Sequence, residues 1–195
     1  MKKIEYPDGA TPIDPDEAAD LKLIHITNQS ELNRWEQENI SEALSWLQQT
    51  KPKDILNEEF VRKLHEKMLG NVWKWAGKYR KSDKNIGCSW QNIRIELKKL
   101  FDDTRFWIEA NKESFDMIAV RFHHRLVSIH PFPNGNGRHA RLITDLLLEN
   151  VLGSLPFSWG DKNLTDNTDM RREYIKALQM ADTLDYNPLL KFVRS

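Results

Sequence analysis

The 195-residue sequence lacks several features that mark large classes of protein. Its one cysteine, Cys88, excludes an internal disulfide framework and any multi-cysteine zinc or iron–sulfur site within one chain. The 29 basic residues equal the 29 acidic ones, so no overall charge attracts nucleic acid or an anionic membrane. No segment is apolar for long enough to span a bilayer or to act as a secretory signal. We therefore expect a cytoplasmic protein in which any cluster of cations acts locally.

Apolar residues recur at helical spacing through most of the chain, and capping residues mark several ends. Asn57 and Ser114 are expected N-caps, and Gly70 follows the end of one helix. Residues 30–51 are expected to form one long helix, or two with a bend. Further helices are expected over residues 57–69, 96–110, 114–129, 137–148, 168–182 and 187–194. The length suits one domain, so we predict a mainly α-helical fold built around the two most apolar helices.

The two ends of this helical pattern differ in composition. The first twenty residues are rich in Pro, Asp and Gly and predict surface turns with one short helix started by Asp14 or Asp16. We divide the chain into an N-terminal extension, residues 1–56, and a core with C-terminal helices, residues 57–195.

Residues 78–95 lose the helical period and carry Gly87 near their centre. Polar residues flank Ile86, and apolar side chains alternate at Ile93 and Ile95. This pattern predicts a short two-stranded β-hairpin that leans on the helices, because an isolated ribbon is only marginally stable.

The stretch HPFPNGNGRHAR, residues 130–141, joins the two most apolar helices. Pro131 ends the first of them, so His130 lies at a helix exit. Gly135 and Gly137 permit positive φ and close backbone approach where the next helix begins. The first amide groups of that helix have no intrahelical acceptor, and the helix dipole favours an anion there.

Two arginines of the same stretch, Arg138 and Arg141, are three residues apart and share one helix face. Taken singly, a histidine in a turn, glycines in a loop and arginines on a helix each have an ordinary structural role. Together they predict a polyphosphate site beside a base, which suits transfer at a phosphorus atom.

The stretch resembles the signature of the Fic family, HxFx(D/E)GNGRxxR. The segments KWAGKYR and RFHHRLVSIHPF also resemble Fic domains, so the similarity covers roughly residues 57–192. The N-terminal PDGATPIDPDEAADL is similar to a subgroup known as mobile mystery protein B. Membership would imply a helical Fic fold and a protein adenylyltransferase that moves AMP from ATP, with Mg²⁺ or Mn²⁺, to a Ser, Thr or Tyr hydroxyl of a target protein or of itself.

Carried over by position, the resemblance makes His130 the base that deprotonates the target hydroxyl. Gly135, Asn136 and Gly137 would form the phosphate cradle, Arg138 would grip the phosphates and Arg141 would hold the γ-phosphate. Phe132 would anchor the loop in the core, and Tyr174 would contact adenine. The hairpin with Asn85, Ile86 and Gly87 would be the flap that aligns the target backbone. Gly137 is typical of adenylylating members, whereas Doc-like kinases tend to have lysine there.

Asn134 departs from the family pattern, which has an Asp or Glu there to hold Mg²⁺. Its neutral amide oxygen can ligate a hard cation without charge attraction, so metal binding should weaken. Three alternatives stay open: slow adenylyl transfer, a different phosphate-containing donor or metal preference, and a nucleotide-binding interaction module without turnover.

Many Fic proteins carry an inhibitory helix with the pattern (S/T)xxxE(G/N). In SELNRWEQENI, Glu38 and Asn39 match its end, while Arg34 occupies the Ser/Thr position. Glu38 is therefore a candidate inhibitory residue, with an ordinary exposed glutamate as the alternative. The mobile-element subgroup would also imply a DNA-binding partner protein.

Two other kinds of site are disfavoured by the residues themselves. His123, His124 and His130 are not expected to form a metal site, because the two adjacent histidines point about 100° apart on a helix and no carboxylate or cysteine completes the set. The tryptophans have no basic surface around them that could follow a nucleic-acid backbone.

Overall fold

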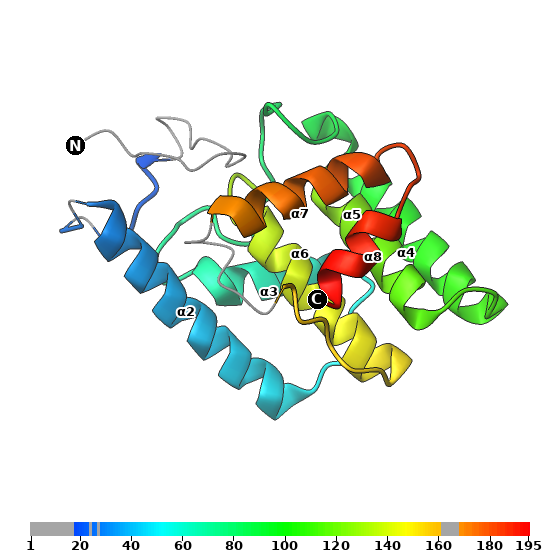
Figure 1. Ribbon diagram of the computed structural model, residues 1–195. Coiled ribbons are helices and arrows are strands. Elements are labelled where there is room, and N and C mark those ends of the chain that lie inside the picture. Colours follow the sequence, from blue (N-terminus) through cyan, green and yellow to red (C-terminus); the bar gives the residue numbers. More distant parts are fainter. Residues whose placement is uncertain (1–17, 24, 27, 161–167) are drawn as a thin grey trace.

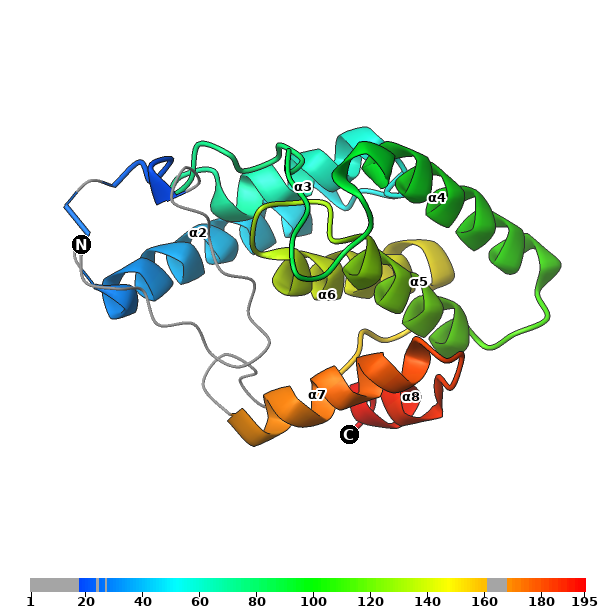
Figure 2. The ribbon, with the colours of Figure 1, turned by 90° about the horizontal axis from the view of Figure 1, so that it is seen from above.

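The computed structural model of the chain describes residues 18–23, 25–26, 28–160 and 168–195. Within these ranges the protein is an assembly of helices with α5 and α6 in the middle (Figures 1 and 2). The helices are α2 (Gln29–Thr50), α3 (Glu58–Leu69), η1 (Trp90–Asn92), α4 (Ile93–Ala110), α5 (Phe115–Ile129), α6 (Asn136–Leu146), η2 (Leu147–Leu152), α7 (Thr168–Ala181) and α8 (Asn187–Val193). The mainly α-helical fold class is confirmed. The short helix predicted at Asp14 or Asp16 lies outside the described residues.

The side-chain caps predicted for two helices are present. The side-chain oxygen of Asn57 accepts from the amide of Phe60 at 2.7 Å and starts α3. The Ser114 hydroxyl accepts from the amide of Met117 at 3.2 Å and starts α5. Each cap satisfies an amide that the first turn of a helix leaves without a partner.

Helix α5 is the centre of the assembly. It contacts α4 on one side and α6, η2 and α8 on others, and its buried face includes Ile118, Phe122 and Leu126. Helix α6 packs in turn against α3. Figure 2 shows α4 and the pair α7 and α8 on opposite sides of α5. The turn between α5 and α6 is therefore held by apolar packing of both helices.

Helix α2 packs on the outside of α3 (Figure 1). Its buried face is unusual because two polar residues, Glu36 and Asn39, are buried in line with Leu32, Ala43 and Leu47. The Asn39 side chain donates to the Lys67 carbonyl at 2.9 Å and accepts from the Asn71 amide at 2.9 Å. The predicted division after residue 56 thus falls between two helices in contact, and it stays a prediction.

The β-hairpin predicted over residues 78–95 is wrong. Residues 78–89 form a loop, and the described part of the chain has only one isolated bridge, between Leu21 and Trp73. The loop directs its backbone toward the end of α5: the amide of Arg80 donates to the Pro131 carbonyl at 3.0 Å and the amide of Cys88 to the Ile129 carbonyl at 3.4 Å.

The alternation that suggested a strand belongs to the first turn of α4. Ile93 is buried and Ile95 is exposed there, because residues two apart on a helix point about 200° apart. A pattern of only two apolar residues fits both structures, and the helix has the longer apolar run behind it.

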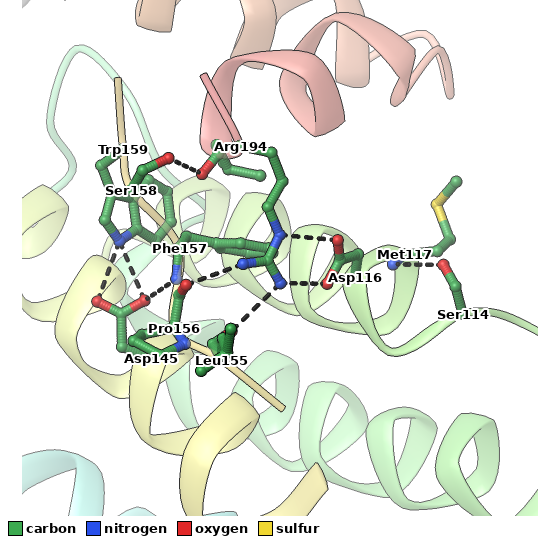
Figure 3. Close-up of polar contacts among 11 residues, drawn as sticks. Ser114, Asp116, Met117, Asp145, Leu155, Pro156, Phe157, Ser158, Trp159 and Arg194 are labelled. Carbon is green, nitrogen blue, oxygen red and sulfur yellow. Dashed lines mark hydrogen bonds and ion pairs between the residues drawn. The ribbon is translucent and has the colours of Figure 1, made fainter. Parts of the chain in front are cut away.

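The C-terminal end of the chain is attached to the central helices by a polar cluster (Figure 3). The Arg194 guanidinium pairs with both carboxylate oxygens of Asp116 on α5 and donates to the carbonyls of Leu155 and Pro156. Asp145 of α6 accepts from the Trp159 indole at 3.0 Å. Burial raises the pKa of Asp145 to about 6, against the opposing effect of its hydrogen bonds.

No helix within the described ranges is both long enough and apolar enough to cross a membrane.

Three histidines are fully enclosed by the helices: His65 on α3, His123 on α5 and His139 on α6. Each ring has a hydrogen-bond partner at one nitrogen or both; for example, His139 Nε2 lies 3.0 Å from the Val61 carbonyl oxygen. Burial lowers the pKa of His123 to about 3, that of His139 to about 4 and that of His65 well below the ordinary value. All three are therefore neutral at pH 7.

These neutral histidines predict a fold that loses stability in mild acid. Below pH 6.5 these histidines bind protons in the unfolded chain. In the folded protein they stay neutral until the pH reaches their lowered pKa values. Each buried histidine should therefore cost about 2 kcal/mol of unfolding free energy between pH 7 and pH 5. Asp145 acts in the opposite direction, since its raised pKa favours the folded state as pH falls toward about 6 and below. Urea unfolding at the two pH values measures the net loss.

Two variants test whether the buried histidines cause the loss of stability between pH 7 and pH 5. His139→Gln removes one buried titrating group and should reduce the difference between pH 7 and pH 5, whereas His25→Gln alters an exposed ring and should leave it unchanged. An equal pH dependence in wild type and His139→Gln would contradict the explanation.

Candidate active site

His130 ends α5 in a left-handed conformation at φ 53°, which turns the chain sharply toward α6. Its amide still donates to the Leu126 carbonyl at 3.2 Å, and its own carbonyl accepts from Arg80 Nε at 2.7 Å. The residue is buried at 5% exposure. A non-glycine residue in this region costs conformational free energy, so surrounding contacts must hold it there.

The His130 imidazole is held in its neutral form. Burial lowers its pKa to about 4, the cations of Arg80 and Lys84 lower it further, and a hydrogen bond with the Val127 carbonyl acts in the opposite direction. A neutral ring that donates to Val127 through one nitrogen carries a lone pair on the other nitrogen, and that lone pair can accept a proton. At pH 7 the site therefore contains a base that is already deprotonated.

The loop after His130 is closed by one side chain. The Asn136 side-chain oxygen accepts from the Phe132 amide at 2.9 Å, and its amide nitrogen donates to the Phe132 carbonyl at 2.8 Å. The Phe132 ring is fully buried and stacks on His65 with 3.7 Å between ring centroids. These contacts anchor the loop in the core, so the Asn136 side chain is committed to the loop itself.

Gly135 is the N-cap of α6 and has φ 77°. Glycine adopts this positive φ easily, as expected from the sequence. A Cβ at this position would lie 2.6 Å from the Leu69 Cδ1 methyl, which would have to shift, so the positive φ is the main reason for glycine here. The first intrahelical bond of α6 runs from the His139 amide to the Gly135 carbonyl at 2.9 Å. The amides of residues 136–138 precede that bond and lie at the positive end of the helix dipole.

The backbone and the side chain of Asn134 are both in hydrogen bonds. Its carbonyl accepts from His65 Nε2 at 3.0 Å, because His65 Nδ1 is the acceptor of the Gly77 amide. Its side-chain oxygen, the atom expected to ligate a metal, accepts from the Gly135 amide at 2.6 Å. Residues 130–141 contain no carboxylate, and the described residues hold no group of three potential metal ligands of the His, Cys, Asp or Glu type. These residues do not form a resident metal site by themselves.

Arg138 already has an acidic partner. Its Nη1 lies 2.7 Å from the Glu36 carboxylate of α2, and the other oxygen of Glu36 accepts from the Trp73 indole at 2.6 Å. The Glu36 side chain is only 9% exposed. Glu38, the residue predicted to be inhibitory, is instead 49% exposed and pairs with Arg34 at 3.1 Å on the outer face of α2. The carboxylate of α2 that reaches the loop is therefore that of Glu36.

Arg141 lies beside a buried polar chain that runs from α7 to α6. Its guanidinium carbon is 5.8 Å from the centre of the Tyr174 ring. The Thr144 hydroxyl donates to the Ala140 carbonyl and so accepts from His123 Nδ1, which makes His123 Nε2 the acceptor of the Tyr174 hydroxyl at 2.7 Å. Burial raises the pKa of Tyr174, while the charge of Arg141 and a hydrogen bond from it act against that rise.

The predicted flap residues Asn85, Ile86 and Gly87 are exposed and belong to the loop rather than to a hairpin. The loop nevertheless lies against the base, because a Cβ on Gly87 would be 2.8 Å from His130 Cβ. The structure thus brings the loop with Gly87, His130 and the first turn of α6 together, with Tyr174 and Arg141 on the α7 side.

The comparisons with known proteins agree with this arrangement. The model of the Fic/DOC family matches residues 55–148, which include α3, α4, α5, the loop and α6. Residues 55–148, just under half of the chain, are therefore identified as a Fic/DOC domain. The match leaves out α2, with Glu36, and the C-terminal helices α7 and α8.

Similar proteins agree with this match, and similar solved structures agree with the fold. The protein adenylyltransferase Fic of Culex quinquefasciatus is 28% identical over 145 residues, covering 72% of this chain and 27% of that protein. Fic-1 of C. elegans (aa134 - 508) has a TM-score of 0.64 at 25% identity, over 80% of this chain and 46% of that one. The N-terminal FIC domain of Bep8 from Bartonella sp. 1-1C has a TM-score of 0.71 at 16% identity, over 90% of both chains. This chain spans about a quarter of the length of the Culex relative.

Sequence reasoning missed Glu36, His65 and Arg80. Glu36 could have been found, because a carboxylate at i+4 from Leu32 interrupts an apolar helix face that continues at Ala43. His65 and Arg80 carried no such signal, since their partners lie 69 and 50 residues away in the sequence.

Removal of the Asn136 side chain tests whether it closes the loop between α5 and α6. Asn136→Ala leaves the Phe132 amide and carbonyl without partners in a buried position, so the free energy of unfolding should fall by about 2 to 3 kcal/mol. Asn150→Ala is the matched control, because that side chain donates one hydrogen bond, to the Pro52 carbonyl, and should cost about 1 kcal/mol. Chemical denaturation measures both, and equal losses would contradict a special role for Asn136.

Proposed function

We propose that this chain transfers AMP from ATP to a hydroxyl group of a target protein. The observation that carries the proposal is the neutral, buried His130 at the entrance to the first turn of α6, with Arg138 and Arg141 on that helix. The relative from Culex quinquefasciatus, named a protein adenylyltransferase, supports the same reaction.

In this reaction His130 accepts the proton of a serine, threonine or tyrosine hydroxyl. The hydroxyl oxygen then forms a bond to the α-phosphorus while the bond from that phosphorus to the bridging oxygen breaks, and pyrophosphate leaves. The amides of Asn136, Gly137 and Arg138 would bind phosphate oxygens at the helix N-terminus. The guanidinium of Arg141 would bind the γ-phosphate by charge-assisted hydrogen bonds.

Two residues take modified roles in this proposal. Tyr174 supports Arg141 from the side of α7, in place of the adenine contact implied by the resemblance, because its hydroxyl is bound to His123. Asn134 offers one neutral oxygen, so any Mg²⁺ or Mn²⁺ would be held mainly by the phosphates of ATP. No step of the proposed reaction is assigned to the metal.

The target would lie along the loop with Asn85, Ile86 and Gly87, which is exposed next to His130. An exposed loop can align an extended peptide through its backbone, so the same surface could receive a segment of another protein or of this chain. The DNA-binding partner, the mobile mystery protein B subgroup and the cytoplasmic location stay predictions.

Glu36 is proposed to regulate the site. Its carboxylate forms an ion pair at 2.7 Å with Arg138, one of the two arginines proposed to bind the phosphates. A nucleotide must displace this partner or share the arginine with it, which weakens binding. The acidic residue pairs here with Arg138, the first arginine of the motif.

Incubation of the full chain with labelled ATP and either Mg²⁺ or Mn²⁺ tests the transfer. The expected product is a protein, a target or the chain itself, that carries AMP by intact mass. His130→Ala should abolish transfer while ATP affinity stays within about twofold, because the base is not a phosphate ligand. Asn134→Asp should increase both metal affinity and rate by adding a carboxylate.

His25→Ala is the control for the His130 variant, since His25 is exposed and far from the loop in sequence. ATP binding without any transfer, in the wild type, in Asn134→Asp and in Glu36→Gln alike, would favour a nucleotide-binding interaction module. Addition of phosphate or of another nucleotide, again by intact mass, would replace ATP-dependent adenylylation with a different donor chemistry.

The regulatory role of Glu36 has its own test. Glu36→Gln keeps an acceptor for the Trp73 indole but removes the charge that holds Arg138, so ATP should bind about tenfold more tightly. Glu38→Gln is the matched control and should change affinity by less than about twofold, because exposed pairs contribute little. Isothermal titration calorimetry measures both. An equal change of ATP affinity in the two variants, or no change in Glu36→Gln, would contradict the regulatory role of Glu36.

A further inference from the structure

Arg80 is a charged residue with no exposed side-chain surface, in a loop whose neighbouring residues are exposed. A guanidinium removed from water is strongly destabilising unless its donors are bound. The pairing carboxylate, Asp83, is 66% exposed and lies 3.5 Å from Nη1, so this ion pair alone does not explain the burial.

The donors of Arg80 are bound by backbone carbonyls from two separate segments. On the side of α5, Nε donates to the His130 carbonyl at 2.7 Å and Nη2 to the Ile129 carbonyl at 3.4 Å. On the side of the loop, Nη1 donates to the Ser82 carbonyl at 2.8 Å and Nη2 to the Cys88 carbonyl. One guanidinium thus connects the C-terminus of α5 to both ends of the exposed loop.

The position at the end of α5 favours a cation. The last carbonyls of a helix carry the negative end of its dipole and have no intrahelical donor, and Arg80 supplies that donor. The hydrogen bond to His130 also acts on the residue in the left-handed conformation, which needs external contacts to persist.

The loop approaches His130 at a second residue, Gly87. Gly87 has φ 108°, and a Cβ built there would lie 2.8 Å from His130 Cβ and 2.8 Å from Arg80 Nη2. Any side chain at this position would push the loop away from both residues. The contact between loop and base therefore depends on Gly87 as well as on the bonds of Arg80.

We propose that Arg80 is a positioning residue for the transfer reaction, which fixes the base His130 and the target-docking loop, residues 82–88, in one geometry. The inference rests on the proposed function and adds to it the group that aligns the attacking hydroxyl with the base. Arg80 does not touch the substrate in this role. It acts through the His130 backbone and through the carbonyls of Ser82 and Cys88.

Arg80 also acts on the protonation of the base. The charged groups that act on the His130 imidazole are Arg80 and Lys84, both from the loop, and the Val127 carbonyl of α5 opposes them. Loss of the Arg80 charge should therefore move the pKa of His130 upward, toward the ordinary value, while burial still keeps it low.

Two substitutions separate geometry from charge. Arg80→Lys keeps the cation but cannot bind four carbonyls in a fixed fork, so kcat should fall by between about 10- and 100-fold, as expected for a misaligned base. ATP affinity should stay within about twofold of wild type, because the first turn of α6 is not altered. Arg80→Gln should lower kcat further and also raise the pKa of His130, whereas Arg80→Lys should leave that pKa low.

The pKa is read by NMR titration of the imidazole signals, assigned with His130→Ala, and does not depend on activity. Arg105→Lys is the matched control, because Arg105 also donates to a backbone carbonyl, that of Leu56, but lies on α4 away from the loop. Circular dichroism and thermal unfolding establish that each variant is folded. A loss of kcat that Arg105→Lys shares, or that runs parallel to a loss of ATP affinity, overturns the proposal.

Gly87→Ala keeps the test decisive if the Arg80 variants do not fold. It leaves Arg80 in place but separates the loop from His130, so kcat should fall at least about tenfold with unchanged ATP affinity. An unchanged kcat in folded Gly87→Ala overturns the proposal. A wild-type chain without transfer contradicts the proposed function instead, and the titration then decides for Arg80 alone: an unshifted pKa of His130 in Arg80→Gln overturns its action on the base.

Discussion

The hydrogen-bonded ring between the Asn136 side chain and the Phe132 backbone is the constraint on which the site depends. It closes the turn between the two central helices and so keeps the end of α5 next to the start of α6. One helix end contributes His130, and the other contributes amides and arginines. Because Phe132 is stacked in the core on His65, the turn cannot open without exposing apolar surface.

Around this turn the protein buries several polar groups that would destabilise an ordinary core. Glu36 on α2, His65 on α3 and Arg80 in the loop each contact a residue of the stretch from His130 to Arg138. Each is hydrogen-bonded to that partner and to at least one further group, such as the Trp73 indole at Glu36 and the Gly77 amide at His65, which offsets the loss of solvation. These contacts fix the protonation and the direction of individual side chains at the turn.

Prediction from the sequence succeeded where the causes are local. The caps at Asn57 and Ser114, the end of α5 before Pro131 and the glycine at the start of α6 are each explained by neighbouring residues, and all were anticipated. The hairpin prediction was wrong because the backbone groups of the loop form hydrogen bonds with the Arg80 side chain and with the end of α5, which is far away in the sequence. Glu38 matched a motif, yet Glu36 lies on the buried side of α2, and only the packing of α2 selects between them.

The sequence by itself determined the helical class, the position of the turn and the chemistry of its residues, because capping, proline and glycine effects and helical periodicity act within a few residues. It also carried the resemblance to the Fic family. Tertiary structure alone decided which carboxylate meets Arg138, that Tyr174 binds His123, and that Arg80 joins the loop to His130. These contacts connect residues 50 to 102 positions apart. Their energies depend on burial, and burial exists only once the helices have packed.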